Sequence, residues 1–186
     1  LYAAGGSDRV ALYLNYERQE ESGVYVDGQT YLPAAWVDAN LNERFYWDAN
    51  EEILVYALPE EIVKSDETTV DEDGKKILYR DGDAVYLSLA LIQKYTDVRL
   101  QAYDGEAQKR VFVENNWDPV TVADAAWSAK IRLRGGLKSP IVTEIKRGGT
   151  VTVLEQYDNW ARVMTPDGHI AVSYTHLRAH ETRHDL

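Results

Sequence analysis

The sequence predicts an α+β chain that is mostly β, and three observations support this. Five of the twelve glycines follow an aspartate, at positions 28, 74, 82, 105 and 168. Asp-Gly between alternating polar and apolar residues is typical of a tight β-hairpin turn, because both turn residues must accept positive φ. Segments rich in Val, Ile and Tyr lie between these turns, and their order recurs about 54 residues later.

The first region consists of an alternating strand, Val10 to Tyr16, and two similar units. In the first unit Asp27-Gly28 leads to Tyr31-Leu32-Pro33, and in the second Asp81-Gly82 leads to Tyr86-Leu87-Ser88. Proline suits the first turn of a helix and serine can cap one, so a short helix is expected after each. Each unit is therefore predicted to read strand, turn, short helix, strand, acidic turn, strand.

The order of motifs in the first unit, which ends in Trp47-Asp48, resembles the stalk-type domain first described at the N-terminus of copper amine oxidases. We assign this domain, with its two repeats, to residues 1–115. The second unit departs from the pattern by having Ser88 for proline and Tyr103 for tryptophan. The resemblance implies a spacer and interaction module of bacterial surface proteins, without copper or oxidase activity.

Between the two units, residues 65–76 hold five clustered acidic side chains, Asp66, Glu67, Asp71, Glu72 and Asp73. Clustered carboxylates are ligands that Ca²⁺ prefers. The ligand spacing of an EF-hand is absent, however, and acidic runs without such spacing are common in solvated loops. The sequence therefore predicts a solvated loop, with no metal site and no cofactor.

Residues 116–129 are rich in small and polar residues and are predicted to be a linker. Residues 130–171 then resemble a bacterial SH3-type domain, most clearly in the segments at 150–155, 160–163 and 167–170. This resemblance implies a small β-barrel. The family's last strand is replaced by foreign sequence, so an open edge is expected at that position.

Residues 172–186 resemble one reading frame of the transposase-type adapter used in short-read sequencing libraries. Such segments are excluded from fold reasoning. The exclusion matters because His176, His180 and His184 are spaced at i, i+4 and i+8, which on a helix would suggest zinc. We interpret the tail as an artefact, with both ends of the natural protein missing.

Charge and composition exclude several function classes. Residues 1–116 carry 11 Lys and Arg against 23 Asp and Glu, and this acidity argues against nucleic-acid binding, which needs a basic surface. No apolar run is long enough for a membrane span. The chain has no cysteine, which excludes disulfides and thiol chemistry and suits the envelope of a Gram-positive bacterium.

No pattern in the sequence suggests catalysis, so the fragment is not expected to be an enzyme. The expected function is binding, through residues near strand ends of the SH3-type module and through cations that could face anionic wall polymers: Tyr157, Asp158, Trp160, His169, Lys130, Arg132 and Arg134. The alternative places Trp160 in the core, because small barrels need aromatic core mass. In that alternative the cations form a solvated face.

The pair of domains resembles the N-terminal half of certain clostridial family 18 glycosyl hydrolases, in which a chitinase-like barrel follows. The resemblance implies an extracellular or cell-surface spacer that binds cell-wall glycan or peptidoglycan and holds a catalytic domain. The alternative is a stand-alone structural or adhesive surface protein without an enzyme.

Overall fold

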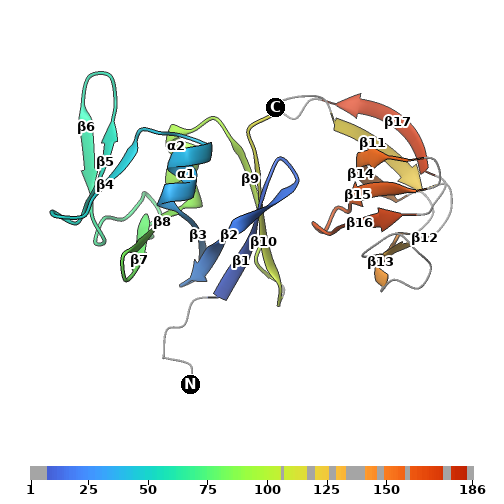
Figure 1. Ribbon diagram of the computed structural model, residues 1–186, viewed down its shortest axis with the longest axis horizontal. Helices are drawn as coiled ribbons and strands as arrows, with labels where there is room; N and C mark the ends of the chain where they lie inside the picture. Colours follow the sequence, from blue (N-terminus) through green and yellow to red (C-terminus); the bar gives the residue numbers. More distant parts are fainter. Residues whose placement is uncertain are drawn as a thin grey trace. The chain divides into compact units, whose positions relative to one another are not determined.

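The computed structural model describes residues 8–105, 107–116, 120–125, 129–132, 141–145, 149–157, 160–173 and 177–183 (Figure 1). Of residues 120–125, 129–132, 141–145 and 177–183 it describes the backbone alone. The described residues are mostly in strands, with two short helices, which confirms the predicted fold class. The chain divides into two compact units, Leu1–Asn115 and Asn116–Leu186, at the position where the predicted linker begins.

Unit 1 contains a large sheet of seven strands. In spatial order these are β7 (Leu78–Asp81), β8 (Ala84–Ser88), β3 (Gln29–Pro33), β2 (Glu17–Val26), β1 (Asp8–Leu14), β10 (Lys109–Glu114) and β9 (Arg99–Tyr103). All neighbours are antiparallel except β1 and β10, which are parallel. The first strand ends two residues earlier than predicted, because Asn15 and Tyr16 adopt positive φ and form a turn to β2.

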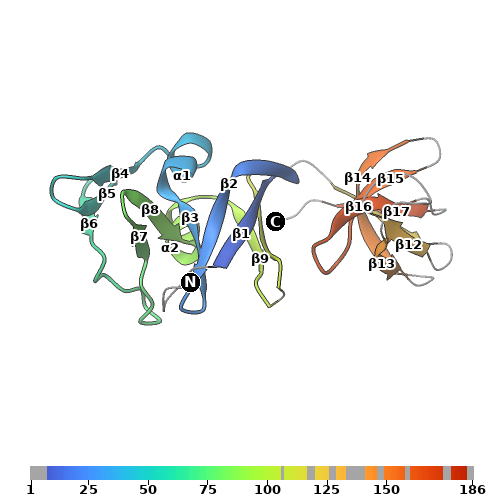
Figure 2. The same cartoon turned by 60° about the horizontal axis from the view of Figure 1, so that its bottom comes forward.

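The rest of unit 1 consists of a smaller sheet and the two helices. The smaller sheet holds β4 (Phe45–Asp48), β5 (Ile53–Ala57) and β6 (Ile62–Ser65), and the helices are α1 (Ala34–Asn40) and α2 (Leu89–Tyr95). Figure 2 shows the smaller sheet at one end of the unit, beyond the helices. Both helices follow the predicted start residues. Ser88 caps α2 by accepting a hydrogen bond from the Leu91 N–H at 3.1 Å, whereas Pro33 makes no side-chain cap.

The two repeats meet within the large sheet, where β3 pairs with β8. Leu32 on β3 pairs with Leu87 on β8, and the pairs on either side are Tyr31–Ser88 and Pro33–Tyr86. In the sequence repeat Tyr31 corresponds to Tyr86 and Pro33 to Ser88. Exchanging the repeats therefore maps the leucine pair onto itself and interchanges the two flanking pairs. The repeats are therefore related by a local two-fold axis through two fully buried leucines.

The two Asp-Gly hairpins of the repeats differ by one residue. In the first, Asp27 and Gly28 are the turn residues and both have positive φ, as predicted for a type I′ turn. In the second, Asp81 still pairs with Ala84, so that the turn residues are Gly82 and Asp83. Only Gly82 has positive φ, the pattern of a type II′ turn. This shift explains why corresponding residues are 54 positions apart before the turn, as for Asp27 and Asp81, and 55 apart after it, as for Tyr31 and Tyr86.

One hydrophobic core joins the two sheets and the helices of unit 1. The smaller sheet is attached through aromatic side chains. The Tyr56 ring on β5 stacks on the Tyr95 ring of α2 at 4.1 Å and lies 4.7 Å from the Phe45 ring. Asn42 donates hydrogen bonds to the Tyr56 hydroxyl at 3.1 Å and to the Tyr95 carbonyl at 3.2 Å. The first repeat's hairpin thus packs on the second repeat's helix.

Unit 2 contains one sheet in which all neighbours are antiparallel. Its order is β13 (Ile141–Ile145), β12 (Ala129–Arg132), β16 (Ile170–Ser173), β15 (Ala161–Met164), β14 (Thr150–Gln156), β11 (Val120–Ala125) and β17 (Leu177–Arg183). The predicted barrel is thus described as a sheet whose edge strands are β13 and β17. The structure differs from the predicted linker 116–129, because β11 lies within it. Val-Thr-Val is β-branched sequence that suits a strand.

The segment identified as adapter also enters this sheet. Val172 and Ser173 complete β16 and pair with β12, while β17 pairs with β11. Edge pairing uses backbone groups, so it does not require natural sequence; the adapter origin stays a prediction. Residues 177–183, which include His180, form a strand and not a helix. His176 and His184 lie outside the described residues.

Candidate functional site

Two of the predicted binding residues form an aromatic stack at the end of the β14–β15 hairpin. The Tyr157 N–H donates to the Trp160 carbonyl at 2.9 Å and closes the turn. The two rings stack with centroids 4.0 Å apart and 22° between their planes. Tyr157 is 44% exposed and Trp160 is partly buried. Trp160 is therefore not enclosed in the core, which contains Val151 and Val163 instead.

Charged side chains border this aromatic stack. The Tyr157 hydroxyl donates to the Glu155 carboxylate, and this hydrogen bond raises the pKa of Tyr157. Arg162, on the adjacent strand, forms an ion pair with Glu155 at 3.4 Å. The stack thus combines an exposed aromatic ring with hydrogen-bonding groups at its border.

His169 does not join this stack. It lies in the β15–β16 turn, where its Nε2 is 3.5 Å from the Asp167 carboxylate and its backbone N–H donates to the Thr165 hydroxyl. Strand β15 separates this turn from Trp160, a distance of roughly 13 Å for four residues. The sequence correctly placed Trp160 and His169 near strand ends, but they lie at opposite ends of β15.

The predicted basic residues are only partly described. Lys130 and Arg132 lie on β12, whose Ile131 pairs with Ser173, and Ser173 in turn pairs with Ala161. The backbone of β12 is therefore in register with the end of β15 that follows Trp160. Arg134 and Asp158 lie outside the described residues.

A second candidate site, which sequence reasoning missed, is an open groove of about 390 Å³ in unit 1. Its lining includes Phe45 and Val85 together with three further aromatic and three acidic residues, Tyr46, Trp47, Tyr86, Asp38, Glu43 and Asp83. These come from α1, the loop after it, β4 and the β7–β8 hairpin. Tyr46 is 63% exposed. The run of three aromatic residues at 45–47 was the signal available in the sequence.

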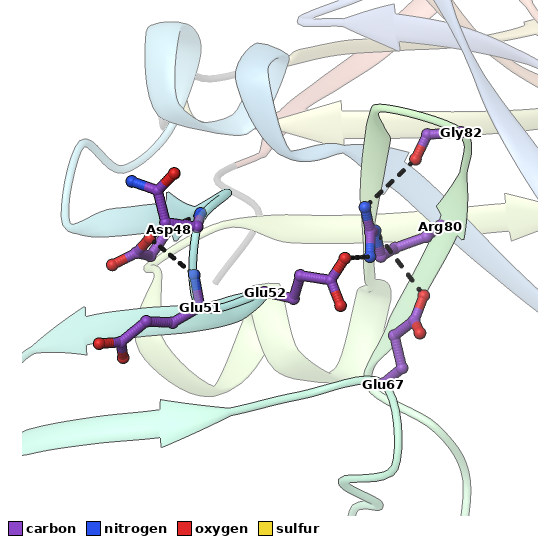
Figure 3. A network of polar contacts seen from close by, with 7 residues as sticks. Asp48, Glu51, Glu52, Glu67, Arg80 and Gly82 are labelled. Carbon is purple, nitrogen blue, oxygen red and sulfur yellow. Dashed lines mark hydrogen bonds and ion pairs between the residues drawn. The ribbon is translucent and has the colours of Figure 1, made fainter.

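A polar network around Arg80 contacts Trp47, one of the groove residues. Figure 3 shows Arg80 of β7 between two glutamates, with ion-pair distances of 3.1 Å to Glu52 and 3.8 Å to Glu67. The Arg80 guanidinium also lies over the Trp47 ring, 5.1 Å from its centroid. Arg80 thereby joins the β4–β5 turn and the loop after β6 to the β7–β8 hairpin.

The acidic loop between the repeats uses its carboxylates for its own turns. Asp66 accepts hydrogen bonds from the Thr68 N–H and hydroxyl, and Asp71 accepts from the N–H groups of Asp73 and Lys75. The hydrogen bonds to Asp66 lower its pKa, chiefly through the Thr68 hydroxyl. Within the described part of the chain, no group of three or more acidic or histidine side chains is placed to hold a metal ion.

No known protein family, curated protein or solved structure matches this chain. Among the described residues, no helix is long and apolar enough to cross a membrane.

Proposed function

We propose that this chain is a non-catalytic region that binds cell-wall glycan and acts as a spacer at the bacterial surface. The observation that carries the proposal is the exposed Tyr157–Trp160 stack at the end of the β14–β15 hairpin. Aromatic side chains with a polar border suit ligands that have both apolar and hydroxyl-bearing surfaces. A pyranose ring has such surfaces, since its C–H groups form flat faces and its hydroxyls point outward.

The proposal is tested by the binding of the whole chain to purified peptidoglycan. Tyr157→Ala is expected to weaken binding about fivefold, since a stacked aromatic contact contributes roughly 1 kcal/mol. Trp160→Ala is expected to weaken it at least as much. Ile62→Ala, at a residue of unit 1 that is 62% exposed, is the control for removing a surface apolar side chain. Unchanged binding by the folded Tyr157→Ala and Trp160→Ala chains would refute the proposal.

A cationic contribution from Lys130, Arg132 and Arg134 is tested separately by salt. At about 1 M salt the Debye length falls to about 3 Å, so attraction to anionic wall polymers should be largely lost. Binding that persists unchanged at this salt concentration would leave the aromatic stack as the binding element and remove the cations from the proposal.

In the whole protein, we propose, this region holds a family 18-like glycoside hydrolase domain near its substrate. The support is the resemblance of the paired domains to the front half of such hydrolases. The chain itself is expected to release no product from chito-oligosaccharides, and measurable cleavage by the purified chain would contradict a non-catalytic role.

A further inference from the structure

The groove of unit 1 carries chemistry that the fold does not require. Both repeats build the same helix and following strand, but two groove residues of the first repeat have no acidic or aromatic counterpart in the second. Asp38 on α1 corresponds to Gln93 on α2, and Tyr46 on β4 corresponds to Ala102 on β9. A side chain needed for the shared fold would be expected in both repeats, so these two residues call for another explanation.

The three carboxylates of the groove are not used inside the described part of the molecule. No hydrogen bond or ion pair there involves the side chains of Asp38, Glu43 or Asp83, and no lysine, arginine or histidine lines the groove. Acidic side chains elsewhere in unit 1 do have partners, such as Glu52 with Arg80 and Asp8 with Lys109. The groove therefore presents negative charge that a bound cation would complement.

We propose that this groove binds a hexosamine unit of a glycan whose amino group is free and positively charged. The flat face of the sugar ring would lie against the exposed Tyr46 ring, and the ammonium group would donate hydrogen bonds to the carboxylates. A volume of about 390 Å³ lies at the lower end of the range for small-molecule sites and suits one or two sugar rings. This inference rests on the proposed glycan-binding function but concerns a different site.

A cationic peptide is the weaker occupant on the same observations. Peptides commonly bind by adding a strand to a sheet edge or by laying a helix in an apolar groove. β4 is an edge strand of the smaller sheet, so a peptide would be able to add a strand there, but that mode binds through backbone groups and does not use the three carboxylates. An ammonium next to a flat ring matches the arrangement more closely than an extended chain does.

The test is calorimetric titration of the whole chain with a glucosamine pentamer and with the fully N-acetylated pentamer. Saturable binding of the free-amine oligomer, at least tenfold tighter than the acetylated one, is expected, because acetylation removes the charge. Tyr46→Ala and Asp83→Asn should each weaken binding about fivefold. Glu60→Asn, an exposed acid of the β5–β6 turn, and Ile62→Ala are the matched controls and should leave it unchanged.

Three outcomes would overturn the inference: equal affinity for the two pentamers, no saturable binding of either, or binding of pentalysine as tight as that of the glucosamine pentamer. The proposed function is judged by other variants. If Tyr157→Ala leaves peptidoglycan binding intact while Tyr46→Ala abolishes glucosamine binding, the stack fails and the groove stands. The reverse pattern would leave the stack and reject the groove.

Discussion

The two repeats of unit 1 form the same elements in the same order but place their last strands differently. In the first repeat β4 and β5 join β6 in a separate three-stranded sheet, whereas in the second repeat β9 and β10 extend the large sheet through β1. The hairpins β2–β3 and β7–β8, in contrast, are related by the local two-fold axis. Duplicated sequence thus produces equivalent local structure, and equivalent tertiary placement only where the repeats contact each other.

Burial explains the difference in placement. Strand β10 is buried at four consecutive positions, 110–113, as expected for a strand with neighbours on both sides and side chains covered on both faces. Strand β5 alternates, with Leu54 and Tyr56 buried and their neighbours more exposed. Such a strand covers the core with one face only, so it suits a small outer sheet.

Substitutions at the two-fold axis should have the largest effects on stability. Leu32→Ala and Leu87→Ala each remove a fully buried side chain and should each lower the free energy of unfolding by about 2–5 kcal/mol. Amide hydrogen exchange of β3 and β8 measures this for unit 1 alone. If the two losses differed by more than about 1 kcal/mol, the symmetry of the backbone pairing would not extend to the packing.

The helix starts should respond unequally to alanine. Ser88→Ala removes the side-chain cap of Leu91 and is expected to cost about 1 kcal/mol. Pro33→Ala removes no cap, so its cost should be smaller. Thermal unfolding of the two variants, compared with Ile62→Ala, checks this order. A larger loss for Pro33→Ala would mean that backbone restriction by proline outweighs capping here.

The corresponding tyrosines Tyr31 and Tyr86 provide a smaller contrast. The buried Tyr31 hydroxyl donates to the Lys76 carbonyl at 2.9 Å, and burial together with the charge of Asp27 raises the pKa of Tyr31. Tyr31→Phe should therefore lower the unfolding free energy by about 1 kcal/mol, and Tyr86→Phe by much less. Equal losses in denaturant titrations would show that the Lys76 contact contributes nothing.

The smallest expected effect on stability comes from substitutions around Asp66, in the loop between the repeats. The folded pKa of Asp66 is lowered, so its contribution to stability is present above the unfolded pKa and is lost as pH falls through the folded pKa. Thr68→Ala should raise the pKa of Asp66 toward its ordinary value, as measured by carboxyl NMR titration. Thr69→Ala should raise it less, because its hydroxyl lies 3.3 Å from the carboxylate compared with 2.6 Å for Thr68.

Local features were the most predictable from sequence. The Asp27-Gly28 turn, the helices after Pro33 and Ser88, and the order of elements in the repeats follow from residue preferences over a few positions. The strand β11 was missed because small and acidic residues around it resemble a linker. The groove was missed because its residues come from five segments, 33–35, 38, 43, 45–47 and 83–86, that no local pattern connects.

The sequence by itself determined the mostly β character of the chain, the internal duplication and the position of Tyr157 and Trp160 near strand ends. Only the tertiary structure decided that β10 pairs in parallel with β1, that His169 lies at the far end of β15 from Trp160, and that Asp38, Tyr46 and Asp83 line one groove. The physical reason is the separation in sequence of the residues that interact. Turns and caps depend on neighbouring residues, whereas strand partners and shared surfaces depend on the burial of side chains distant in the sequence.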